Sequence, residues 1–356
     1  MKSTHLYNTV FILVVLISSC NSSTKNRITN DKSLFILNNK EIQIDQIKQL
    51  NEIKNNTEII GLWNGYIVDS LILFQSSEFI NSYLVYDSKT MKYKGRILKN
   101  GQGPNEFLAL DYFNQYINSD NEISIWVMDH ALHKIRLVDI YASINSKSTV
   151  INKEFDFKGE LNNMYLVNDS LRVCTNMNGD NFEFANLNVF NQEYTPLFKI
   201  IDVALHTINP MLISSGSTIK ADRTKFVLSM AFFNQIMITD VEGKSKFTIS
   251  IGKPKTVAEV IEDFDNEKLK YQFGGAISTN TQIWIIYNDM TLKDFNQSTS
   301  NLKSKVLVFD WEGNLLHTFA TKQKLKSIYF NQNKTILYGI DTSEAIYQYN
   351  ISDYIQ

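Results

Sequence analysis

The stretch Val306-Leu307-Val308-Phe309-Asp310 is an alternating apolar segment closed by an aspartate, and it decides the fold of this chain of 356 residues. Similar segments closed by Asp or Asn occur at residues 83–87, 135–139, 187–191, 236–240 and 346–350. Their closing residues lie 40 to 70 positions apart. A recurrence of roughly 40 to 50 residues is typical of propellers and repeat arrays.

The neighbours of these segments complete a repeating unit. A more continuous apolar run precedes several copies, as at residues 123–128 and 283–287, and suits a strand buried on both faces. Turns rich in Asp, Asn and Gly follow, and then another strand. Four short strands per unit make one propeller blade, so the sequence predicts an all-β, six-bladed β-propeller over residues 32–356. A β-sandwich, or two packed all-β domains, is the alternative architecture.

The two ends of the ring and one long interval need separate explanations. The last unit supplies about three strands, so we expect an N-terminal strand, from residues 34–37 or 42–44, to close the last blade. Residues 256–270 carry apolar side chains at helical spacing. They predict a short helical insertion between blades four and five.

The N-terminus resembles a bacterial lipoprotein signal. Lys2 is followed by an apolar stretch over residues 11–17 and then by Ser18-Ser19-Cys20. The resemblance implies a signal peptide over residues 1–19, acyl chains on Cys20, and a flexible tether over residues 20–31. We therefore expect a protein anchored by lipid in the bacterial cell envelope, at the outer membrane. The membrane is its first predicted partner.

Two further motifs carry a family resemblance. Residues 127–139, Val-Met-Asp-His-Ala-Leu-His-Lys-Ile-Arg-Leu-Val-Asp, resemble an NHL-type repeat. Residues 101–107, Gly-Gln-Gly-Pro-Asn-Glu-Phe, resemble an element common in TolB-like six-bladed propeller lipoproteins. The resemblance implies a propeller along essentially the whole chain. It implies no particular activity.

Composition and motifs exclude several classes of function. Loss of Lys2 with the signal leaves 34 basic against 37 acidic residues, so nucleic acid is not an expected partner. The glycines at 101 and 103 lack the remainder of a phosphate-binding motif, and no serine nucleophile elbow occurs. No cofactor, metal or catalytic residue is assigned, although Asp129, His130 and His133 contain ligand-type side chains. Cys174 is expected in the core.

The candidate binding site follows from propeller geometry. Turns between second and third strands share one face with the connections between blades, and such loops commonly carry binding residues. The ligand-binding candidates on this rim are Asn105, Glu106, Asp129, His130, His133, Asp289, Asp294 and Phe295. Trp63 and Trp311 could stack on sugars, whereas Trp126 and Trp284 are expected in the core.

We therefore expect a binding or protein-interaction module for a peptide, a glycan or an envelope protein. The alternative is a lyase or hydrolase with its site at the mouth of the central channel.

Overall fold

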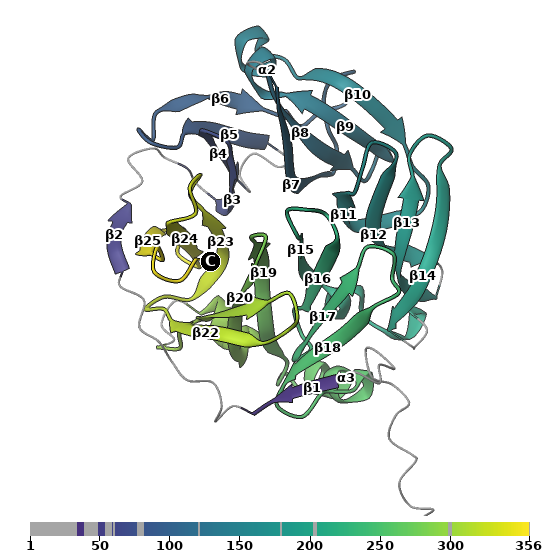
Figure 1. Cartoon of the computed structure of the whole chain (residues 1–356), viewed down its shortest axis with the longest axis vertical. Helices are drawn as coiled ribbons and strands as arrows, with labels where there is room; N and C mark the ends of the chain where they lie inside the picture. Colours follow the sequence, from purple (N-terminus) through teal and green to yellow (C-terminus); the bar gives the residue numbers. More distant parts are fainter. Residues whose placement is uncertain are drawn as a thin grey trace, which may run out of the picture.

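The protein is described by a computed structural model, in which six β-sheets surround a central axis (Figure 1). This confirms the predicted six-bladed propeller. The structure describes residues 34–38, 49–53, 59, 61–76, 82–119, 122–178, 180–201, 205–297 and 301–355. The predicted signal peptide, Cys20 and the tether lie outside these residues.

Four strands of each blade pair antiparallel, and the first of them lies nearest the axis (Figure 1). Blade one contains β3 (Leu62–Val68), β4 (Leu71–Ser76), β5 (Ser82–Asp87) and β6 (Tyr93–Ile97). Blade two contains β7 (Leu110–Ser119), β8 (Glu122–Asp129), β9 (Lys134–Asp139) and β10 (Val150–Asp156). Blade three contains β11 (Glu160–Leu166), β12 (Leu171–Asn178), β13 (Asn181–Asn188) and β14 (Glu193–Ile201).

The remaining blades repeat this arrangement. Blade four contains β15 (Ser215–Ile219), β16 (Lys225–Met230), β17 (Gln235–Asp240) and β18 (Lys246–Ile251). Blade five contains β19 (Lys270–Ser278), β20 (Gln282–Thr291), β21 (Lys305–Asp310) and β22 (Leu315–Ala320). Blade six contains β23 (Leu325–Phe330), β24 (Ile336–Asp341), β25 (Ile346–Asn350) and the N-terminal β2 (Gln49–Ile53).

The recurring segment is the third strand of each blade, and its closing residue builds the next turn. The Asp310 carboxylate accepts hydrogen bonds from the backbone N–H groups of Glu312 at 3.0 Å and Asn314 at 2.8 Å. The third copy was placed wrongly, because β13 ends at Asn188 and residues 189–192 form the turn. The Asn188 side-chain oxygen accepts a hydrogen bond from the Phe190 N–H at 3.0 Å, so Asn188 is the closing residue that stabilises this turn.

An N-terminal strand completes the last blade, as predicted, but neither predicted segment supplies it. β2 pairs antiparallel with β25, whereas β1 (Leu34–Leu37) pairs parallel with β18 as a fifth strand of blade four. Residues 42–44 lie outside the described part of the chain. The segment before blade one therefore contacts two blades of the ring.

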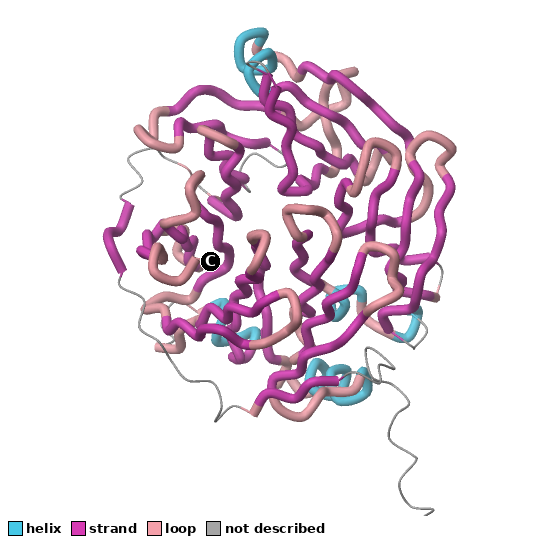
Figure 2. Tube along the Cα trace, viewed as in Figure 1, coloured by secondary structure: helices cyan, strands magenta, loops and turns pink. Residues whose placement is uncertain are grey.

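The helical insertion between blades four and five is confirmed as α3 (Val257–Asp265). Thr256 and Glu259 form a capping box at its start, and Val257 and Val260 are buried. The other helices are short: α2 (Ile140–Ser146), α4 (Leu292–Asn296), η1 (Leu205–Thr207) and η2 (Pro210–Ile213). Figure 2 shows them in the connections around the strands. No helix among the described residues is long and apolar enough to cross a membrane.

The core lies between the blades, where apolar side chains of neighbouring sheets meet. The side chain of Cys174 is fully buried, as expected, together with those of Trp126 and Trp284. Trp311 is also buried, and its indole N–H donates to the Thr279 carbonyl at 3.1 Å. Trp63 is the exposed tryptophan of the four.

Candidate functional site

A cavity of about 550 Å³ lies at the axis of the ring. Its wall takes residues from the innermost strand of every blade, namely β3, β7, β11, β15, β19 and β23. Residues from connections also line it, among them Ser214, Phe232 and Phe295. A volume of this size is typical of sites that hold small ligands.

The cavity opens on the face that carries the long connections, here named the looped face. Ser214 ends the connection from blade three to blade four, Phe232 lies in the β16–β17 turn, and Phe295 lies in α4 between β20 and β21. Hydrogen bonds join these connections to their neighbours; for example, the Asn234 side-chain amide donates to the Ile251 carbonyl at 2.7 Å. This bond ties the β16–β17 turn, which carries Phe232, to the end of β18.

Irregularities in the inner strands shape the cavity. The pairing register shifts between Tyr112 and Tyr116 in β7, between Asn162 and Tyr165 in β11, and between Phe273 and Ala276 in β19. β-Bulges of this kind redirect side chains and are common beside functional sites. Asn114 and Asn163 lie within two of these shifts, with φ of 53° and 45°. Asparagine tolerates this left-handed conformation better than most residues.

The third register shift, between Phe273 and Ala276 in β19, contains two glycines, Gly274 and Gly275. A Cβ atom built on Gly275 would meet no other atom within 4 Å, whereas one on Gly274 would meet Ile286 at 3.1 Å. Both glycines line the cavity. At these two positions the β19 wall is backbone, and a side chain at residue 275 would project into open space.

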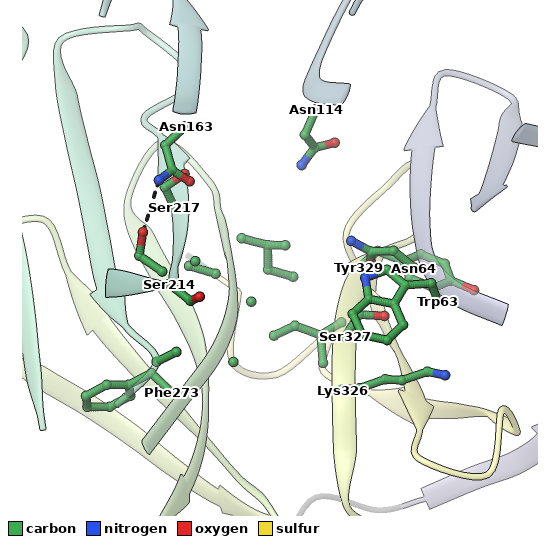
Figure 3. A pocket seen from close by; sticks show the side chains of 18 of the residues that line it. Trp63, Asn64, Asn114, Asn163, Ser214, Ser217, Phe273, Lys326, Ser327 and Tyr329 are labelled. Atoms are coloured by element: carbon green, nitrogen blue, oxygen red, sulfur yellow. Dashed lines mark hydrogen bonds between the residues drawn. The ribbon is translucent and has the colours of Figure 1, made fainter. Parts of the chain in front are cut away.

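One wall of the cavity combines an exposed aromatic ring with a cation. Figure 3 shows Trp63, Asn64 and Lys326 on the same side. The Trp63 side chain is 61% exposed, and the Lys326 Nζ lies 5.7 Å from its ring centroid. Burial lowers the pKa of Lys326 below its usual value. The Asn64 side-chain amide donates to the Tyr66 hydroxyl at 2.7 Å.

The opposite wall is a network of hydroxyl and amide groups. The Ser217 hydroxyl donates to the Asn163 Oδ1 at 2.8 Å, and the Asn163 Nδ2 donates to the Ser215 Oγ at 3.0 Å (Figure 3). The Tyr165 hydroxyl donates to the Ser217 carbonyl at 2.7 Å. Burial, followed by the nearby charge of Asp111, raises the pKa of Tyr165, so its hydroxyl stays neutral. The groups of this wall are uncharged and hydrogen-bonded to one another.

Several polar groups of lining residues keep unused hydrogen-bonding capacity. The hydroxyls of Tyr112, Ser327 and Tyr329 are buried and have no partner in the described part of the chain. Asn114 points between the two walls in Figure 3. Because these three hydroxyl oxygens are buried, they lie behind the surface of the cavity, whereas the side chain of Asn114 is exposed and available to a ligand.

The cavity carries little charge. Asp111 and Lys326 are the two charged side chains among its lining residues. The Asp111 Oδ2 lies 3.9 Å from the His130 Nε2, so each charged group already has a neighbour within the protein. Among the described residues, no group of three or more His, Cys, Asp or Glu side chains is placed to hold a metal ion.

A family model described as TolB-like 6-blade propeller-like matches residues 66–333. This chain belongs to the TolB-like six-bladed propeller family. The match covers most of the chain. It includes part of β3 and the whole innermost strand of each of the other five blades. No curated protein matches the chain.

Two solved structures share the fold of this TolB-like propeller. One is a member of the DUF4221 family from Bacteroides vulgatus, with 10% sequence identity and a TM-score of 0.57 over 86% of this chain and 97% of that chain. The other is a putative exported protein from Bacteroides fragilis, with 10% identity and a TM-score of 0.51 over 89% and 98%. At this identity the likeness establishes the fold alone.

Of the rim residues predicted from the sequence, the TolB-like propeller places Phe295 in the cavity wall. Its ring lies 4.5 Å from that of Tyr271, centroid to centroid. His130 lies at the edge of the cavity through its approach to Asp111. His133 is exposed, and its ring centroid lies 5.3 Å from that of Phe157.

Three predicted candidates have structural partners. Asp129 is fully buried, and its carboxylate accepts from the N–H groups of Leu108 at 2.9 Å, Ala109 at 3.2 Å, Ala131 at 3.1 Å and Leu132 at 3.2 Å. Asp289 pairs with Lys270 at 2.8 Å. Asp294 accepts a hydrogen bond from the N-cap residue of α4, Thr291, at 2.6 Å.

Asn105 and Glu106 lie elsewhere. They line an outer groove of about 520 Å³ between β6 and α2. The Glu106 carboxylate pairs with Lys99 at 2.9 Å and accepts from the Gly103 N–H at 2.9 Å. Both interactions lower the pKa of Glu106. This carboxylate closes the glycine-rich connection and does not face the central cavity.

The cavity residues that sequence reasoning missed are Asn114, Asn163, Ser214, Ser217 and Lys326. They lie on or beside innermost strands, whereas the prediction looked only at turns and connections. A signal was present: asparagine and serine interrupt segments that otherwise alternate as strands, as in Ser214-Ser215-Gly216-Ser217. Polar residues at such positions indicate that the strand faces a polar space.

Proposed function

We propose that this chain is a lipid-anchored binding protein of the bacterial cell envelope that holds its ligand in the central cavity of the looped face. The cavity is the observation that supports the proposal. It combines enclosed volume, a wall of hydrogen-bonded hydroxyl and amide groups, and an exposed tryptophan beside Lys326. Concave sites with a few oriented polar groups are the usual form of ligand-binding sites.

Binding without chemistry fits the composition of the wall. The lining residues include one carboxylate, Asp111, one lysine, Lys326, and no histidine, so the wall holds few of the side chains that commonly serve acid–base catalysis. The second candidate is a lyase or hydrolase. The observation that favours it is the approach of His130 to Asp111, 3.9 Å apart at the edge of the cavity.

The direction of β1 supports an orientation on the membrane. β1 runs parallel to β18, and Leu37 at its end accepts a hydrogen bond from Gly252 N–H at 2.8 Å, where the chain reaches the looped face. Leu34 therefore begins the strand on the side of the opposite face. Thirteen residues separate Cys20 from Leu34 and span at most about 45 Å. We propose that the anchor lies beneath the opposite face and that the cavity opens away from the membrane.

The test uses the mature chain with Cys20→Ala, which makes it soluble, and a variant that also carries Gly275→Phe. Thermal shift against a library of envelope-derived peptides and glycan fragments should find ligands that raise the Tm of the first protein. The phenylalanine side chain projects from the cavity wall and occupies part of the cavity, so those shifts should shrink or disappear in the second. Mass spectrometry of each ligand after incubation should recover it unchanged. Ligands that shift the Tm of both proteins equally contradict the cavity site, and converted ligands establish the enzyme.

A further inference from the structure

Lys326 is a cation that lines the central cavity without forming an ion pair. It lies in β23, the innermost strand of blade six, and its side chain is half-buried. Among the described residues, no carboxylate oxygen lies within 4.0 Å of its Nζ, which faces the Trp63 ring at 5.7 Å from the centroid. An ammonium group that has lost part of its water is stabilised by an anion placed beside it.

The two carboxylates whose charges act on Lys326 are hydrogen-bonded elsewhere. Asp341 accepts from the Ser343 N–H at 2.9 Å, and Glu344 accepts from the Gly61 N–H at 2.8 Å. Their charges raise the pKa of Lys326, but burial lowers it by more, so this pKa lies below its usual value. The positive charge of Lys326 is therefore only partly balanced within the protein.

Trp63 gives the same wall an apolar surface. Trp63 is 61% exposed, whereas the other three tryptophans are 3% exposed or less. It lies in β3, which contacts β23, and Figure 3 shows Trp63 and Lys326 on one side of the cavity. A ligand at this wall can therefore contact a cation and the face of an aromatic ring together.

The carboxylate among the lining residues belongs to a different wall. Asp111 lies in β7 of blade two, so blade one separates it from Lys326 in blade six. Asp111 also borders an adjoining cavity of about 280 Å³, which Lys326 does not line. An anionic group is therefore favoured at the Lys326 wall and repelled near Asp111. One cation in a site that also holds one carboxylate fits a single negative charge better than a dianion.

Asn114 offers an uncharged polar contact for the rest of such a ligand. Its side chain is exposed and points between the two walls in Figure 3. A side-chain amide both donates and accepts hydrogen bonds. It can therefore bind a hydroxyl or amide group of the ligand without changing the charge balance of the site.

We propose that the central cavity binds a ligand with one carboxylate group, which pairs with Lys326 while an adjoining ring stacks on Trp63. This inference rests on the proposed function, because it names the ligand class of the same cavity. An acidic sugar and the free C-terminus of a peptide both supply this chemistry. A probe of each kind separates the two sources.

The experiment compares each acid with its neutral counterpart by titration calorimetry on the soluble mature chain with Cys20→Ala. One pair is cellobiouronate and cellobiose. The other is an N-acetylated tripeptide ending in tyrosine, as the free acid and as the C-terminal amide. We expect at least one acid to bind about tenfold or more tightly than its counterpart. Its affinity should fall between about 25 and 300 mM NaCl, because salt screens a partly exposed ion pair.

Two variants and one control locate the carboxylate. Lys326→Gln should weaken binding of the acid about 10- to 100-fold, the range expected for loss of a hydrogen bond between charged groups. Trp63→Leu should weaken it about three- to tenfold through loss of the aromatic contact. Lys322→Gln is the matched control, because it removes the same charge from an exposed residue outside the cavity; it should bind as the parent does. Circular dichroism establishes that each variant is folded.

The outcomes separate the two proposals. An acid that binds Lys326→Gln as tightly as the parent overturns the carboxylate inference, and so does equal binding of an acid and its neutral counterpart. Failure of both acids to bind overturns it too. In each of these cases the proposed function stands if the thermal-shift library gives a ligand that depends on the cavity, and it falls if the library gives none.

Discussion

A Cβ atom on Gly216 of β15 would lie 2.6 Å from the carbonyl oxygen of Gly274 in β19. The inner strands of blades four and five therefore approach through their backbones. The buried Ser229 hydroxyl lies 3.2 Å from the Gly216 carbonyl oxygen and 3.3 Å from that of Gly274, and hydrogen-bonds to both. This contact joins blades four and five beside the cavity.

Gly216→Ala should therefore destabilise the propeller. The added methyl group must displace backbone, and overpacking of this kind costs about 1–3 kcal/mol. Gly275→Ala is the matched control, because the same methyl group meets no atom within 4 Å. Urea denaturation should show a lower free energy of unfolding for the first variant and little change for the second. Equal effects would mean that the two strands are not in backbone contact.

Asp129 illustrates a buried carboxylate with a structural role. Four backbone N–H groups donate to it, those of Leu108 and Ala109 in the connection between blades one and two and those of Ala131 and Leu132 in the β8–β9 turn. Asp129→Ala leaves these donors without an acceptor and should lower the free energy of unfolding by about 2–4 kcal/mol. Asp129→Asn keeps the oxygen that serves three of them and should cost less. If ligand binding by the folded Asn variant is lost while stability is kept, Asp129 has a ligand-binding role instead.

The ring was predictable from the sequence because its signals are local. The strand at residues 306–310 ends with the aspartate that stabilises the next turn. Asp310 accepts its hydrogen bonds from residues two and four positions later. The closing strand was missed because β2, Gln49-Leu50-Asn51-Glu52-Ile53, has little apolar alternation. Its place depends on pairing with β25, almost 300 residues away, which no local pattern encodes.

The cavity was less predictable for a related reason. Asn114 and Asn163 take part in it because the pairing register shifts around them, and a one-residue shift reverses which side chains face the axis. Phe295 was found because it lies in a long connection. Trp63 was recognised as a candidate for stacking, but its exposure depends on how blades six and one meet.

Glu106 should make stability depend on pH. Its pKa is lowered in the folded protein by Lys99 and by the Gly103 N–H. A carboxylate with a lowered folded-state pKa contributes stability that is fully present above its unfolded value, near 4.5, and is lost as pH falls through the lower folded value. The free-energy difference between the parent and Glu106→Gln should thus be present at pH 7 and shrink below about pH 4.5.

Denaturation curves from pH 7 to pH 3 measure this difference. Glu262→Gln on the exposed side of α3 serves as the comparison and should follow the parent at every pH. A difference that grows toward acid pH would show that Glu106 is destabilising in its ionised form, contrary to the ion pair with Lys99.

Thiol reactivity should report on both cysteines at once. Burial raises the pKa of Cys174 to about 12, and its Sγ lies 3.8 Å from the Ala185 carbonyl oxygen, so it should not react with a thiol reagent at pH 8 while the protein is folded. The thiolate is the reactive form, and the side chain is inaccessible. In the anchored mature protein, the lipid proposed on Cys20 blocks the other thiol. Labelling should therefore detect no reactive thiol in the native protein and one in urea. The Cys174→Ala variant should show none in either state. One reactive thiol in the native protein would mean that Cys20 carries no lipid.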